Sequence, residues 1–144
     1  MRYRAVLIPA MAAMALGGAF LAAKSRAAEP PAAYAPGLGD FMTAYVEPHH
    51  IKLWFAGTSG NWALAAYEAD ELGETFDDVV TYQGVWKGVQ IGALVKAIVD
   101  PAIKKVDAAI ATKNQAAFRD AYGTLTASCN SCHMTAMHPF LVVK

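Results

Sequence analysis

Two cysteines and a histidine form the densest group of reactive side chains in the sequence, within Cys129-Asn130-Ser131-Cys132-His133. The two thiols are three positions apart, and the imidazole directly follows the second thiol. This spacing is typical of c-type haem attachment, in which each sulfur adds to one vinyl group and the histidine binds the iron. The chain has no other cysteine, so its sulfur chemistry is committed to this one place.

The Cys-x-x-Cys spacing also occurs in redox-active dithiols and in zinc sites. A thioredoxin-like dithiol would need a βαβ surround, and the strand-forming runs of that fold are missing from the sequence. A zinc site would need further closely spaced ligands, and there is neither a second cysteine pair nor a His-x-His group. We therefore predict one covalent haem c, bound through Cys129 and Cys132, with His133 as an iron ligand.

The composition predicts one globular domain that follows a leader and a linker. The chain has 144 residues, 56% of them hydrophobic and 17% charged, which suits one core better than two. Residues 29–39 carry three prolines and two glycines without helical periodicity. We predict a signal peptide over residues 1–27, a flexible linker over residues 28–37 and a haem-binding domain over residues 38–144.

The leader has the order of parts found in export signals. Arg2 and Arg4 make its start basic, residues 5–23 are apolar and uncharged, and small residues surround the expected cleavage point after Ala27 or Ala28. The alternative is an uncleaved helical anchor, because the apolar run is near the lower length limit for crossing a bilayer. Either way, the sequence predicts that the globular part lies outside the cytoplasm, in the periplasm.

Removal of the leader would change the charge of the protein. The full chain has 12 basic and 12 acidic residues, and cleavage after Ala27 removes four bases and no acid. The mature protein is thus expected to carry about four net negative charges. That balance argues against nucleic acid or an anionic membrane surface as a partner, and we expect another redox protein instead.

Apolar residues recur at helical spacing in four segments, and no segment of useful length reads as a strand. The segments cover about residues 38–56, 62–80, 91–110 and 115–137. A proline interrupts the first segment and another the third, where we expect kinks. The lengths and short connections predict an all-α fold, an antiparallel up-down-up-down four-helix bundle that encloses the haem.

Two of the predicted helices have faces that matter for the site. The inward stripe expected on the first helix comprises Leu38, Met42, Tyr45, His49, Leu53 and Ala56. The second helix has an acidic face that we expect to be solvated, with docking of a basic redox partner as the alternative. That face comprises Glu68, Asp70, Glu71, Glu74, Asp77 and Asp78.

The helix register suggests a second iron ligand. Because the first and last helices run antiparallel, His133 should lie level with about residue 43, where Met42 faces inward and offers a sulfur. The competing role for Met42 is ordinary core packing. His49 and His50 should lie about 10–12 Å further along the helix axis. We expect His49 to be a core or propionate-contacting residue and His50 to be exposed on the flank.

The residues that follow the motif are too close to it to bind the opposite face of the haem. Met134, Met137 and His138 lie one, four and five positions after His133, on the same helix or just past its end. They belong to the same side of the ring as His133. We expect them to fill the core or to mark the end of the helix.

A late Cys-x-x-Cys-His motif on the last of four helices resembles the class II c-type cytochromes, the cytochrome c-prime group. The resemblance covers about residues 38–143 and implies a haem between the first and last helices, with His133 as proximal ligand. In some members an early methionine of the first helix is the second ligand, and Met42 stands at the matching place. The chain departs from that group after the motif, at residues 134–139, and along the segment from Lys52 to Glu68.

Three functions follow from this prediction. The first is a periplasmic electron carrier that is not an enzyme, with both axial positions of the iron filled by His133 and Met42. The alternative is a gas-binding protein with an open distal side, which would take up nitric oxide or carbon monoxide. A peroxidase would need a distal acid-base residue, and only His49 or His50 could serve. The sequence leaves open whether the protein forms a homodimer.

Overall fold

The computed structural model describes residues 34–144. The predicted signal over residues 1–27 and the first part of the predicted linker, residues 28–33, lie outside the described residues. Residues 34–37 have no regular structure and lead directly into the first helix.

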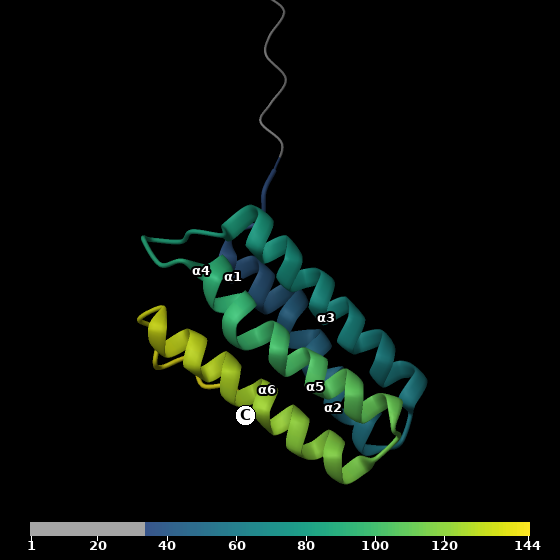
Figure 1. Ribbon diagram of the computed structural model, residues 1–144. Coiled ribbons are helices and arrows are strands. Elements are labelled where there is room, and N and C mark those ends of the chain that lie inside the picture. The colour runs from purple at the N-terminus through teal and green to yellow at the C-terminus, as the bar shows by residue number, and fades with distance from the viewer. Residues whose placement is uncertain (1–33) are drawn as a thin grey trace, which may run out of the picture. The chain divides into compact units, whose positions relative to one another are not determined.

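The described chain folds into a four-helix bundle, which confirms the predicted all-α class (Figure 1). Each helical run lies antiparallel to the run before it (Figure 1). The first run comprises α1 (Leu38–Phe41), the π-helical η1 (Met42–Val46) and α2 (Glu47–Thr58). The second is α3 (Trp62–Gln83). The third comprises α4 (Ile91–Leu94), the π-helical η2 (Val95–Val99) and α5 (Asp100–Ala111), and the fourth is α6 (Gln115–Thr135).

Asparagine side chains cap the two helices that follow tight connections. The Asn61 carboxamide oxygen accepts a hydrogen bond from the Leu64 N–H at 3.2 Å. The Asn114 oxygen accepts from the N–H groups of Ala116 and Ala117, both at 3.0 Å. These bonds satisfy amide groups that have no partner inside the helix, so each chain reversal ends in a well-started helix.

Each helical proline follows a widened π-helical turn that the sequence did not predict. Both π-helical segments end two residues before a proline, Pro48 in one case and Pro101 in the other. In η1, for example, the Glu47 N–H bonds to the Met42 carbonyl, five residues back. A proline lacks an N–H and its ring collides with the carbonyl four residues earlier, and a wider turn is a way to relieve that collision. Both runs therefore continue through their prolines.

The π turn in the first run changes which residues face the core. Phe41 and Val46 are both buried although they are five positions apart. Tyr45, which we expected on the inward stripe, is 47% exposed. That prediction was wrong because it assumed 3.6 residues per turn throughout, whereas the π segment inserts one extra residue into the turn.

One residue of the predicted acidic face is buried. Glu68 on α3 has a relative exposure of 3%, and its Oε2 lies 2.7 Å from Nδ1 of His49 on α2. The expectation of a solvated carboxylate was wrong here, because a buried charge requires a partner and His49 provides one. His49 itself is half-buried in this pair, and the other predicted acidic residues of α3 are exposed or half-exposed.

Gly57 permits the closest approach between α2 and α6. A Cβ atom at this position would overlap the ring of Phe118, and Phe118 is fully buried and has no free space to move into. The two helices that carry the site are thus held together partly by the lack of a side chain at Gly57.

Substitution Gly57→Ala is expected to lower the free energy of unfolding by about 1–3 kcal/mol, the usual cost of overpacking a core. Urea denaturation of the purified protein measures it. The matched control is Gly123→Ala on α6, where an added Cβ meets no atom within 4 Å. The control should be stabilising by about 0.4–1 kcal/mol, because alanine restricts the unfolded chain. Equal effects of the two substitutions would contradict the close approach at Gly57.

None of the helices formed by residues 34–144 has both the length and the apolar character needed to cross a membrane. The loop between α3 and α4 folds back on the bundle through Trp86, whose ring packs against His138 with centroids 5.2 Å apart.

Candidate haem site

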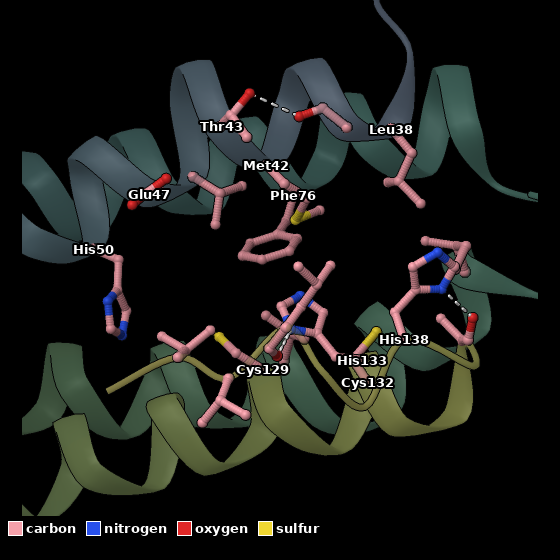
Figure 2. A pocket seen from close by; sticks show the side chains of 18 of the residues that line it. Leu38, Met42, Thr43, Glu47, His50, Phe76, Cys129, Cys132, His133 and His138 are labelled. Carbon is pink, nitrogen blue, oxygen red and sulfur yellow. Dashed lines mark hydrogen bonds between the residues drawn. The ribbon is translucent and has the colours of Figure 1, made fainter.

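A cavity of about 630 Å³ lies within the bundle, between the first and last helical runs (Figure 2). Its walls come from α1, η1 and α2, from Phe76 of α3, from Trp86 in the loop before α4, from α4 and η2, from α6, and from the chain that follows α6. Most of the lining side chains are aliphatic or aromatic. A mostly apolar cavity of this size with a few polar groups is typical of a site for a cofactor.

The three motif residues form one wall of this cavity. Cys129, Cys132 and His133 all line it, and all three belong to α6 (Figure 2). Their spacing of three and four positions places them on one face of the helix. Cys129 is buried, Cys132 is half-buried, and neither is in a disulfide. The structure thus brings together the three residues that the sequence singled out.

The hydrogen bond of His133 determines which of its ring nitrogens is free. Nδ1 lies 2.8 Å from the carbonyl oxygen of Leu141. A carbonyl can only accept, so Nδ1 carries the proton and donates, and the lone pair of the neutral ring is on Nε2. A histidine that binds a metal usually donates its second nitrogen to a carbonyl or carboxylate in this way. His133 therefore has the tautomer that an iron ligand requires.

Met42 lies on the wall that faces α6 across the cavity. It is half-buried at the start of η1, and its side chain points toward the same space as His133 (Figure 2). Of the methionines in the described part of the chain, Met42 alone lines the cavity. Its place is the one that the register argument predicted, and its role as an iron ligand stays a prediction.

The residues after the motif differ from our expectation in part. Met134 and Met137 are 60% and 79% exposed, so neither fills the core. They lie at the end of α6, where helical backbone stops and Met137 adopts a positive φ of 62°. His138 lines the cavity beside Trp86, and its Nδ1 donates to the Ala136 carbonyl at 2.7 Å.

The thiol environment is the opposite of that in a redox-active dithiol. Burial raises the pKa of Cys129 to about 11, and burial also raises the pKa of Cys132. Catalytic Cys-x-x-Cys motifs instead lower the pKa of one thiol to produce a thiolate. Within residues 34–144 there is also no group of three or more His, Cys, Asp or Glu residues placed to hold a metal ion. The raised pKa values of the two thiols therefore do not favour a redox-active dithiol.

His50 was predicted to be exposed, and that prediction was wrong. It is 4% exposed, it lines the cavity, and both of its ring nitrogens have partners on α6. Tyr122 donates its hydroxyl proton to the His50 carbonyl at 3.0 Å. That hydroxyl must then accept from Nδ1 at 2.8 Å, which leaves Nε2 to accept from Thr126 at 3.1 Å. Burial lowers the pKa of His50 to about 4, so the ring is neutral at pH 7.

The π turn explains the burial of His50. Val46, His50 and Leu53 are all buried and recur at intervals of four and three, which defines the inward stripe of α2. His50 lies one position after His49, the residue expected on the inward stripe, whereas Leu53 is buried as that stripe predicted. Pro48 was the available signal, because a proline inside an amphipathic run marks a place where the register can change.

The chain that follows α6 supplies a wall of the cavity that the sequence did not predict. Residues 139–144, here called the strap, turn back and run along α6 (Figure 2). Residues 140–144 of the strap line the cavity. Pro139 indicated that α6 must end, but nothing local in the sequence indicated where the chain would go next.

Comparison of this chain with protein-family models, with curated proteins and with solved structures found no match.

Proposed function

We propose that this protein is a c-type cytochrome that carries single electrons on one covalently attached haem. The observation that supports this most directly is a single apolar cavity that has Cys129, Cys132 and the free Nε2 of His133 on one wall. Met42 on the facing wall adds a second donor atom. All four residues were singled out by the sequence for this chemistry.

The residues present fit a haem attached through two thioethers. Addition of a thiol across a vinyl group forms a carbon–sulfur bond and moves the thiol hydrogen to the second vinyl carbon, so no oxidant is needed. Cys129 and Cys132 line the cavity as free thiols and suit that addition. His133 and Met42 would hold the iron from opposite sides. When bound, the haem supplies a one-electron couple whose potential a methionine ligand raises.

An electron carrier agrees with the contacts of the two histidines that the sequence offered as distal acid-base groups. His50 is the histidine best placed to act as a distal acid or base, and hydrogen bonds occupy both of its ring nitrogens. His49 does not line the cavity and pairs with Glu68 instead. An iron held by two protein ligands exchanges an electron with little rearrangement, and no substrate has to bind. We therefore propose a carrier rather than an enzyme.

The proposal also covers the location of the protein in the cell and its relationship to known cytochromes. Export by residues 1–27 would bring the chain to the periplasm, where its partner would be another redox protein. The late motif, the four-helix bundle and the site of Met42 support a relationship to the class II c-type cytochromes.

One pair of ultraviolet-visible spectra tests the proposal. The protein is exported from a host that matures c-type cytochromes, purified, and measured oxidised and then reduced with dithionite. We expect the spectrum of a thioether-bound, low-spin haem in both states, because His133 and Met42 would both bind the iron. A reduced high-spin iron that binds carbon monoxide rapidly would favour the gas-binding alternative. A purified protein without haem absorption would refute both.

A further inference from the structure

We propose that Asn130 and the strap position His133, so that the first variable residue of the motif sets the orientation of the proximal ligand. This inference rests on the proposed function, because it assigns a role around the same histidine. Attachment of a haem needs only the two cysteines and the histidine of the motif. The role of Asn130 is therefore additional to the motif itself.

Asn130 clamps one residue of the strap with two hydrogen bonds. Its Nδ2 donates to the Val143 carbonyl at 2.9 Å, and its Oδ1 accepts from the Val143 N–H at 2.8 Å. The side-chain amide thus uses a donor and an acceptor on the same backbone residue, which fixes both the place and the direction of the strap. A carboxamide offers this donor and acceptor on two neighbouring atoms, whereas an ionised carboxylate has no donor and an alanine has neither group.

A second anchor holds the other end of the strap. The His138 N–H donates to the His133 carbonyl at 2.8 Å, which closes the end of α6. The Leu141 N–H then donates to the His138 carbonyl at 3.1 Å. The carbonyl of Leu141 lies between this turn and the clamp at Val143, and it accepts the proton of His133 Nδ1 at 2.8 Å.

The geometry connects Asn130 to the imidazole in two steps. Loss of the clamp would free the strap beyond Leu141 and with it the carbonyl that orients the His133 ring. A hydrogen bond at Nδ1 makes the imidazole a stronger electron donor through Nε2 and stabilises the oxidised iron. Without it, the ring can rotate and the ligand donates less, so the reduction potential should rise. Asn130 and Leu141 are positioning residues, because neither touches the iron.

The test compares Asn130→Ala with Ser131→Ala in the purified full-length protein. Ser131 occupies the other variable position of the motif and is half-buried like Asn130. Hydrogen exchange of the Val143 amide should accelerate about tenfold in Asn130→Ala, the effect of losing one hydrogen bond. The reduction potential should rise in the same variant. Ser131→Ala should change neither quantity.

A second variant removes the clamp by a change in the strap, and it tests the same inference if Asn130→Ala does not fold. Val143→Pro removes the N–H that donates to Asn130, and it should raise the potential in the same direction. Faster exchange at Val143 without a change in potential would overturn the inference. So would a change in potential that Ser131→Ala reproduces.

Failure of this inference can be told apart from failure of the proposed function. If the purified protein carries no haem, nitrogen-15 chemical shifts of the His133 ring replace the potential as the readout. The Nδ1–H tautomer should then dominate in the parent and in Ser131→Ala, and should be lost in Asn130→Ala. A tautomer that Asn130→Ala leaves unchanged would overturn the strap as a positioning device.

Discussion

Replacement of both motif cysteines by serine is expected to leave the exported protein without covalently bound haem. A hydroxyl does not form the thioether, so Cys129→Ser combined with Cys132→Ser removes both attachment points. Intact-mass spectrometry of protein exported from a host that matures cytochromes measures the result directly. The parent should carry the added mass of one haem, and the double variant should have the mass of the polypeptide alone.

The single variants sharpen this test. Cys129→Ser and Cys132→Ser each leave one thiol on the same wall of the cavity, so any haem retained by either must be held by one bond. Ser131→Ala, which lies between the cysteines, is the control and should retain the full haem mass. A parent protein without added haem mass would refute the proposed function. Haem that survives denaturation of the double variant would refute attachment through these sulfurs.

The burial of the thiols determines their chemical state in a protein without attached haem. Cys129 is 8% exposed, and burial raises its pKa to about 11. At neutral pH the side chain is a protonated thiol inside an apolar wall, where it is protected from the oxidation and exchange reactions that thiolates undergo. A parent protein to which no haem was attached should therefore still contain two reduced thiols. Their count by alkylation after unfolding distinguishes failed attachment from oxidation.

The sequence predicted the four residues that meet at the cavity better than it predicted the rest of the cavity wall. The spacing of a Cys-x-x-Cys-His motif is itself typical of c-type haem attachment. Helical periodicity then places Cys129 and His133 on an inward face. The same periodicity predicted four helices, because their apolar stripes are long enough to be unambiguous. Met42 followed from the antiparallel arrangement of the first and last runs, which short connections make necessary.

The errors have a common physical origin. Tyr45 and His50 were assigned to the wrong faces because the π turn before Pro48 adds one residue to the helix, and periodicity assumes that none is added. Glu68 is buried because a histidine 19 positions earlier lies opposite it, and such pairs depend on how two helices meet. The strap was missed for the same reason. Its course depends on Asn130 meeting Val143, a contact that no local pattern reveals.

His50 and the strap, whose positions the sequence did not predict, both line the cavity. The neutral His50, whose ring nitrogens are both hydrogen-bonded, lines the cavity together with Cys129. The strap covers another side. Met42 is left as the side chain with a sulfur donor on the wall opposite the motif (Figure 2). The ligand role of Met42 is therefore the part of the proposal with the clearest spectroscopic consequence.

Substitution Met42→Ala is expected to convert the reduced haem from low spin to high spin. Alanine has no donor atom, so His133 would be the one protein ligand left on the iron and the ligand field would weaken. The reduced iron should then bind carbon monoxide rapidly, because a coordination position has opened. The reduction potential should fall, since a methionine ligand stabilises the reduced iron. Visible spectra and carbon monoxide binding rates measure these changes.

The matched control separates coordination from the general effect of losing a methionine. Met134→Ala removes the same side chain from a position that is 60% exposed and does not line the cavity. It should leave the spin state, the carbon monoxide rate and the potential as they are in the parent. If Met42→Ala remains low spin, another side chain must bind the iron, and His50 and His138 are the histidines besides His133 that line the cavity. If the parent is already high spin, Met42 is only packing, and the gas-binding alternative replaces the electron carrier.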